Sequence, residues 1–105
     1  MKKKTKIAFL DRDGVLNSSI KNNGYIGKIK DFKWIKGSKK TIKYLKSKKF
    51  KIVIVSNQSG IARGYFSIKD VYKLHSFLQS ELKKFGTKVD KIFFCPFHID
   101  GVVKK

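Results

Sequence analysis

Two acidic residues near the start of the chain are the side chains best placed to do chemistry. The apolar run from Lys6 to Leu10 is bounded by charge and predicts a buried strand, and Asp11 and Asp13 follow it directly, before Gly14. In open α/β sheets, ligands bind outside the carboxyl ends of strands. There, one carboxylate can attack phosphorus and a second can exchange protons with the leaving group. An ordinary strand-to-turn junction would also contain Asp and Gly.

A second polar segment follows a second predicted strand. The β-branched run from Lys51 to Val55 continues into Ser56 to Gly64, which reads SNQSGIARG. A hydroxyl, backbone N–H groups freed by glycine and an arginine fork are the donors that a phosphate group requires. We therefore expect both polar loops to form one site at neighbouring strand ends, although two ordinary surface loops would give the same pattern.

The composition predicts one globular domain over residues 1–105. Apolar residues make up 41% and aromatic residues 13% of the 105-residue chain, and the single Cys excludes an internal disulfide framework. No apolar run approaches the ~20 residues of a membrane span. The run from Ile7 to Leu10, which follows the amino-terminal lysines, is too short for a secretory signal. These features predict a cytoplasmic protein.

The formal charge of +19 raises the question of nucleic-acid binding. The arginines, Arg12 and Arg63, both lie within the two polar loops, and every other basic residue is a lysine. Recognition of nucleic acids commonly uses arginine for planar, bidentate contacts. Scattered lysines indicate a solvated surface that attracts anions and polyanions without sequence preference. We therefore expect no specific nucleic-acid partner.

The remaining pattern predicts alternating helices and strands. A helix over 39–48 is expected, with Ser38 as its N-cap and with Ile42 and Leu45 facing inward. Ser67 and Asp70 resemble a capping box that opens a second helix, which Gly86 ends. The apolar face of that helix comprises Val71, Leu74, Leu78, Leu82 and Phe85. With a third strand over 91–94, the order is βαβαβ, which implies a parallel sheet.

The two polar loops together resemble the haloacid dehalogenase (HAD) superfamily. The segment Asp11 to Val15 carries the superfamily-level signal, whereas Ser56 to Gly64 narrows it to the small capless branch of heptose bisphosphate and histidinol-phosphate phosphatases. Cys95 to His98 extends the similarity, which covers Lys6 to His98. The resemblance implies an α/β, Rossmann-like fold of three layers (αβα) with a parallel sheet, of which this chain has the first, βαβαβ half.

The resemblance also implies roles for individual residues in Mg²⁺-dependent hydrolysis of a small phosphorylated metabolite. Asp11 matches the nucleophile that forms an aspartyl-phosphate, and Asp13 matches the general acid/base. The carboxylate of Asp11 and the backbone carbonyl of Asp13 match the Mg²⁺ ligands. Residues that match phosphate or substrate contacts are Arg12, Gly24, Tyr25, Ser56, Asn57, Gln58, Ser59 and Arg63. Arg63 fits a structural ion pair equally well.

The sequence departs from this family pattern in two places. Relatives have a zinc loop with further cysteines, but this chain offers only Cys95 and His98, and two ligands do not make a zinc site. We therefore expect no zinc, and we expect Cys95 to be a small buried residue and His75 to be packed within its helix.

The family's later lysine and third metal-binding carboxylate have no counterpart before Lys105. Three explanations stay open: a fragment of a longer enzyme, one half of a two-chain enzyme, or a phosphate-binding or interaction domain with little catalysis. A phosphatase that processes nucleic-acid ends is a third functional candidate. Because the family's first strand is central, its open edge predicts a homodimer or a second chain that pairs there.

Overall fold

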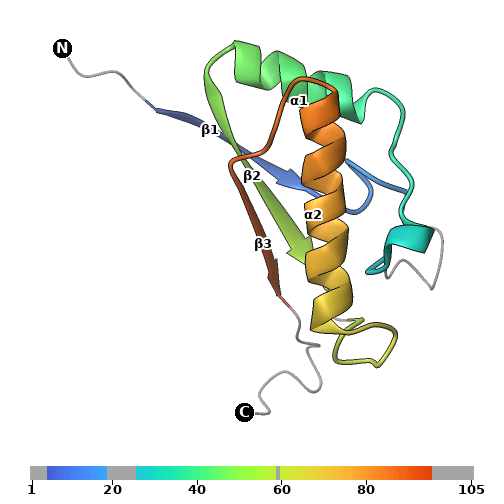
Figure 1. Cartoon of the computed structure of the whole chain (residues 1–105). Coiled ribbons are helices and arrows are strands. Elements are labelled where there is room, and N and C mark those ends of the chain that lie inside the picture. Colours follow the sequence, from blue (N-terminus) through green and yellow to red (C-terminus); the bar gives the residue numbers. More distant parts are fainter. Residues whose placement is uncertain (1–4, 19–25, 59, 96–105) are drawn as a thin grey trace.

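The strands form one parallel sheet in the computed structural model, which describes residues 5–18, 26–58 and 60–95 (Figure 1). Strand β1 (Lys6–Asp11) pairs with β2 (Phe50–Asn57), which pairs with β3 (Lys91–Cys95), so the order is β1-β2-β3. The register aligns Asp11 with Val55 and Asn57 with Cys95. The polar loops that follow β1 and β2 therefore leave the same edge of the sheet.

Helices α1 (Ser38–Ser47) and α2 (Ile68–Lys84) connect the strands, and a short 3-10 helix, η2 (Ile29–Asp31), precedes α1. The capping box of α2 is confirmed, because Ser67 Oγ accepts a hydrogen bond from the Asp70 N–H and the Asp70 carboxylate accepts one from the Ser67 N–H. Gly86 adopts a positive φ of 85° just beyond α2, as expected for a helix stop.

The N-cap expected for α1 is wrong. Ser38 is already helical, and Gly37 occupies the cap position with a φ of 88°. The hydroxyl of Ser38 is buried and donates instead to the carbonyl oxygens of Leu16 and Ile35. Tertiary contacts with the loop after β1 therefore decide the role of this serine.

Both helices cover the same face of the sheet. The core joins Ile42 of α1 to Leu78 and Leu82 of α2 through Ile52 and Ile54 of β2, and all five have no exposed surface. The predicted parallel βαβαβ order is confirmed. The helix layer that the family fold places on the opposite face is not among the described residues, so this part of the chain forms two layers.

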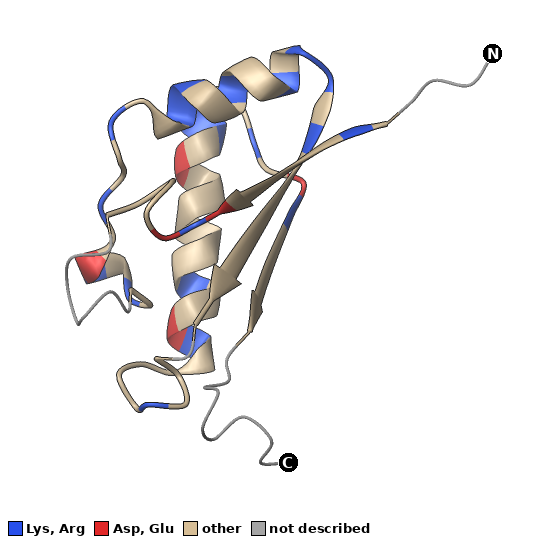
Figure 2. Ribbon diagram, turned by 180° about the vertical axis from the view of Figure 1, so that it is seen from behind, with Lys and Arg blue, Asp and Glu red and all other residues tan. Residues whose placement is uncertain are grey.

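On the opposite face, apolar side chains are left uncovered by the described residues. We call this the open face and define it by Ile7, Phe9, Val55 and Phe93, which are 48%, 68%, 41% and 54% exposed. Figure 2 views the sheet from this side and shows that its strands are mostly uncharged. In the described residues, no helix has the length and apolar character needed to cross a membrane.

Candidate active site

The site is built where β1 and β2 end. Asp11 is the last residue of β1, and Asp13 lies two residues further in a tight turn in which Gly14 has a φ of 87°. Ser56 lies near the end of β2, and Gln58 follows directly after that strand. The two polar loops are in contact, because Gln58 Nε2 donates a hydrogen bond of 3.1 Å to Asp13 Oδ2.

The carboxylate of Asp13 is held by donors from three residues. Its Oδ1 accepts from Nε and Nη2 of Arg12, at 3.2 and 2.8 Å, and from Nδ2 of Asn17 at 2.9 Å. Its Oδ2 accepts one bond, of 3.1 Å, from Nε2 of Gln58. The two oxygens are therefore unequal, and Oδ2 keeps more acceptor capacity for a proton or a ligand.

Arg12 points into the protein. Its side chain has no exposed surface, and its Nη2 also donates to the carbonyl oxygen of Ile26, while Nη1 lies 2.9 Å from Nε2 of His75. Burial lowers the pKa of Arg12, and the charge of Asp13 opposes that effect. This placement does not suit the expected contact between Arg12 and phosphate, so we correct that expectation: Arg12 orients Asp13.

His75 is the partner that sequence reasoning missed. It is a buried residue of α2, as expected for a packed histidine, but it also contacts Arg12 and packs edge-on against Phe94, with 5.6 Å between ring centres. Burial, and then the positive charge of Arg12, lower the pKa of His75 to about 4. The imidazole is therefore neutral near pH 7. No local signal identifies this contact, because the two residues are far apart in sequence.

Gln58 connects Asp13 to the second loop. Its Nε2 donates to Oγ of the buried Ser56 as well as to Asp13. Its Oε1 is buried with no hydrogen-bond partner within the described part of the chain. An unsatisfied buried oxygen is costly, so this position has a second acceptor ready for a donor. A protonated Asp13 would supply this donor if the Gln58 side-chain amide turned so that Oε1 faced Asp13.

Asp11 ends β1 and is not among the hydrogen-bond partners of Asp13 described above. It lines a pocket of about 370 Å³ together with residues from the ends of β2 and β3, including Asn57, Phe93 and Cys95. Asp11 and Asn57 are both exposed. The candidate nucleophile therefore opens to solvent on the open face, whereas Asp13 is fixed from within.

Of the other predicted residues, two lie within the described part of the chain and four lie outside it. Arg63 is exposed in the turn after β2. Cys95 is exposed, so the expectation that it is buried is wrong: its side of the sheet carries no helix layer in the described structure. Gly24, Tyr25, Ser59 and His98 lie outside the described residues.

A family comparison agrees with this geometry. Residues 6–99 match the family described as polynucleotide kinase 3 phosphatase. The chain belongs to this phosphatase family. The match covers both polar loops and all three strands, so the site described above lies within the residues that match this family.

Curated relatives that are similar in sequence to this chain have names more specific than that of the family. The chain is 41% identical over 96 residues to the D-glycero-beta-D-manno-heptose-1,7-bisphosphate 7-phosphatase of Rhodopseudomonas palustris, which covers 91% of this chain and 52% of that protein. It is 43% identical over 98 residues to the D-glycero-alpha-D-manno-heptose-1,7-bisphosphate 7-phosphatase of Campylobacter jejuni, covering 93% and 55%. The chain thus spans about half the length of these relatives.

Solved structures give the same picture. A D,D-heptose 1,7-bisphosphate phosphatase from B. bronchiseptica, complexed with magnesium and phosphate, superposes with a TM-score of 0.84 at 32% identity, covering 91% of this chain and 52% of that one. A HAD-like phosphatase from Mesorhizobium loti superposes with a TM-score of 0.79 at 30% identity, covering 93% and 45%. The resemblance to HAD phosphatases, in fold and family, is confirmed.

Proposed function

We propose that this chain carries the aspartate half of the active site of a Mg²⁺-dependent phosphatase, acting on a small phosphorylated sugar such as D-glycero-D-manno-heptose 1,7-bisphosphate. The observation that carries the proposal is the Asp13 carboxylate, which Arg12, Asn17 and Gln58 hold two residues after the exposed Asp11. The names of the relatives support the sugar substrate. Such an enzyme would work in the cytoplasm and belong to carbohydrate metabolism.

In the proposed reaction, the two aspartates divide the work. A carboxylate oxygen of Asp11 attacks phosphorus, the phosphorus–oxygen ester bond breaks, and the leaving alkoxide takes a proton from Asp13. Asp13 then removes a proton from water, which attacks the aspartyl-phosphate and releases phosphate. The unequal oxygens of Asp13 fit this role, because Oδ1 anchors the carboxylate while Oδ2 carries the proton.

The residues at the end of β1 fit Mg²⁺. This hard cation takes oxygen ligands, and it is commonly held by one or two carboxylates together with substrate phosphate and water. Asp11 supplies an exposed carboxylate in the pocket, and the backbone carbonyl of Asp13 would be a second oxygen ligand. When bound, the metal offsets the repulsion between the anionic nucleophile and the anionic phosphate.

Substitution of the two aspartates tests the proposal in an enzyme whose second half is present. Asp11→Asn should abolish Mg²⁺-dependent phosphate release, because the covalent route is lost. Asp13→Asn should lower kcat by about 10²–10⁴-fold, the usual contribution of a positioned proton donor. Asp31→Asn in η2 is the matched control and should retain activity. Full activity of Asp11→Asn would refute the nucleophile assignment.

The 105-residue chain alone should be nearly inactive as a phosphatase.

A histidinol-like phosphate ester is the nearest alternative substrate, and a parallel assay with both esters separates the two. A competing phosphate-binding role without catalysis predicts that inorganic phosphate binds but no ester is cleaved.

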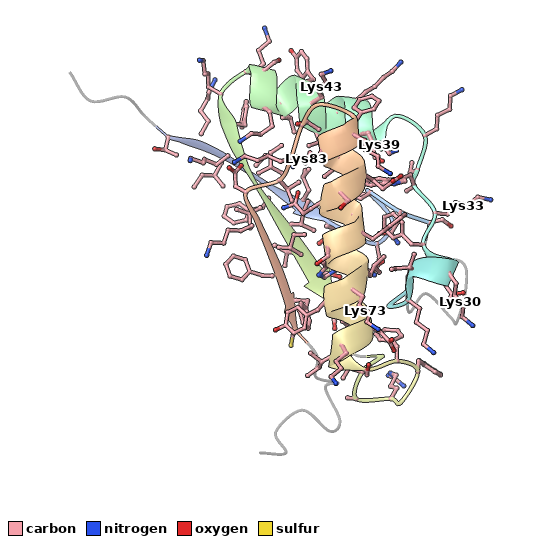
Figure 3. The ribbon with its side chains drawn as sticks, in the orientation of Figure 1. Lys30, Lys33, Lys39, Lys43, Lys73 and Lys83 are labelled. Atoms are coloured by element: carbon pink, nitrogen blue, oxygen red, sulfur yellow. The ribbon has the colours of Figure 1, made fainter. Side chains whose placement is uncertain are left out.

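Polynucleotide 3′-phosphate is a second candidate substrate, favoured by the description of the family and by the charge of +19. Figure 3 shows labelled lysines on both helices, Lys39 and Lys43 on α1 and Lys73 and Lys83 on α2. Oligonucleotide binding through such scattered lysines should be sequence-blind and should collapse towards physiological salt. A tight complex with one sequence at ~0.15 M salt, where the screening length is about 8 Å, would favour the nucleic-acid substrate.

A further inference from the structure

We propose that His75 is a positioning residue: by accepting a hydrogen bond from Nη1 of Arg12, it fixes the guanidinium that holds the Asp13 carboxylate. The geometric part of this inference stands on the contacts of the buried cluster. Its catalytic consequence, an acid/base step that depends on a residue of α2, rests on the proposed function.

The three guanidinium nitrogens of Arg12 have different partners. Nε and Nη2 donate to Oδ1 of Asp13, and Nη2 also donates to the carbonyl oxygen of Ile26. Nη1 lies 2.9 Å from Nε2 of His75. A guanidinium is a rigid, planar fork, so a partner for Nη1 also restricts the directions in which Nε and Nη2 point. His75 therefore supplies a constraint on the fork that comes from a different element, α2.

Burial makes the acceptor at position 75 necessary. The side chain of Arg12 has no exposed surface, and His75 is only 7% exposed. A buried donor that loses its acceptor carries the full cost of its lost hydration. Without an acceptor at position 75, we expect the guanidinium to turn until Nη1 finds another partner. That turn would move Nε and Nη2 away from Asp13.

The imidazole is itself held by aromatic packing. Phe94 of β3 lies edge-on to His75, with 5.6 Å between ring centres, and edge-on to Tyr72, with 5.4 Å. Phe94 therefore packs against two rings of α2. Edge-to-face contacts of this kind are favourable and directional. They keep the histidine ring in the orientation that presents Nε2 to Arg12.

The same packing connects the two arms that hold Asp13. Phe94 pairs in register with Ser56 of β2. Ser56 accepts from Nε2 of Gln58, which also donates to Oδ2 of Asp13. One arm reaches Oδ1 through the imidazole and the guanidinium, and the other reaches Oδ2 through the hydroxyl and the amide. The carboxylate is thus held from two sides by residues that meet at neighbouring positions of β2 and β3.

The catalytic consequence concerns the leaving group. In the proposed reaction, Asp13 gives a proton to the alkoxide as the phosphorus–oxygen bond breaks. A misplacement of about 1 Å in such a group can cost about 10²-fold in rate. The loss should be large for a sugar phosphate, because its alkoxide needs the proton. It should be small for 4-nitrophenyl phosphate, because the stable nitrophenolate leaves without one.

The first test measures the geometry in the 105-residue chain. His75→Gln keeps an acceptor within reach of Nη1, whereas His75→Asn carries the same amide on a side chain that is one methylene shorter. Heteronuclear NMR should show separate, slowly exchanging Nη resonances of Arg12 in the parent chain and in His75→Gln, and averaged ones in His75→Asn. His75→Leu, which has no acceptor, is the second variant and should behave as His75→Asn does. Unchanged Arg12 resonances in the Asn and Leu variants would overturn the proposal.

The second test measures kcat/KM in the enzyme whose second half is present. For the heptose bisphosphate, His75→Asn should lower kcat/KM by about 10- to 100-fold, and for 4-nitrophenyl phosphate by less than about threefold. His75→Gln should restore most of both values. Leu82→Ala is the matched control, because Leu82 is a fully buried residue of α2. It should lower stability but leave the ratio of kcat/KM between the two esters unchanged.

Equal losses on the two esters in His75→Asn would overturn the catalytic part of the inference, because a merely structural role would affect both alike. A parent enzyme that hydrolyses neither ester would refute the proposed function. The NMR measurement would still decide whether His75 fixes Arg12, since it requires no turnover.

Discussion

Nη1 of Arg12 lies 2.9 Å from Nε2 of His75, and this contact ties the loop after β1 to the middle of α2. A guanidinium only donates hydrogen bonds, so Nε2 must accept and the neutral imidazole carries its proton on Nδ1. The same guanidinium holds Asp13. The orientation of the proposed acid/base therefore depends on a histidine of a distant helix.

Removal of the buried cation should destabilise the protein. Arg12→Met removes the guanidinium donors from the Asp13 carboxylate and the Ile26 carbonyl, and we expect a loss of about 3 kcal/mol in the free energy of unfolding. Arg12→Lys should recover only part of this, because one ammonium cannot reproduce the fork. Urea unfolding measures both.

The matched control is Lys40→Met, which removes an exposed cation from α1 and should change stability by less than about 0.5 kcal/mol. Equal effects of Arg12→Met and Lys40→Met would contradict the structural role of Arg12.

The free energy of unfolding should decrease as the pH decreases, because His75 becomes protonated. Its pKa is lowered to about 4 in the folded chain, by burial and then by Arg12, from a usual 6.5. The unfolded chain therefore binds the proton first as the pH drops. The contribution of His75 is complete above about pH 6.5, decreases as the pH falls, and is lost below about pH 4, with a total of up to about 3 kcal/mol.

His75→Gln isolates this effect, because the amide oxygen can accept from Arg12 but does not titrate. Unfolding free energies at several pH values between 7 and 4 should decline less steeply in the variant. Identical slopes for the two proteins would show that His75 is not held neutral.

Asp90 should fasten the start of β3 to β2. Its carboxylate accepts from Lys46 Nζ at 2.8 and 3.1 Å and from the Ile52 N–H at 2.7 Å. Burial raises the pKa of Asp90, but the bonds from Lys46 and Ile52 outweigh it and the pKa is lowered overall. Asp90→Ala should cost about 2 kcal/mol by leaving the Ile52 donor unpaired.

Lys46→Met separates the contribution of the Lys46–Asp90 ion pair from that of the hydrogen bond between the Ile52 N–H and Asp90. This substitution removes only the partly exposed ion pair and should cost less than about 1 kcal/mol. If Lys46→Met costs as much as Asp90→Ala in thermal or urea unfolding, the bond to Ile52 is not the main contribution.

The capping box of α2 should be worth about 1 kcal/mol. Ser67→Ala removes the acceptor for the Asp70 N–H at the first turn, and thermal unfolding should show the loss. Ser80→Ala, an exposed position within α2, is the control and should not lower stability. A neutral Ser67→Ala would show that this helix end needs no cap.

Most elements could be predicted from sequence because their signals are local. The apolar spacing of α2, its capping serine and the β-branched run of β2 each depend on residues only a few positions apart. The error at Ser38 has the opposite origin. A serine before a helix is a good cap, but here the carbonyls of Leu16 and Ile35 compete for its hydroxyl.

The site was predictable in outline and not in its internal contacts. Strand ends and donor-rich loops placed Asp11, Asp13, Ser56 and Gln58 together without any tertiary information. Nothing in the segment around Arg12 says whether its guanidinium points to solvent or inward. That direction depends on His75 and on the carbonyl of Ile26, which only the folded chain brings near.

The parallel register has a consequence for the order in which the chain folds. Lys6 pairs with Phe50, and Val53 pairs with Lys91, so each strand meets its neighbour only after a whole helix has been synthesised between them. Folding through such distant pairs is slow. A nascent chain therefore carries β1 with both strand edges unpaired until β2 has been synthesised, and unpaired strand edges of this kind favour aggregation.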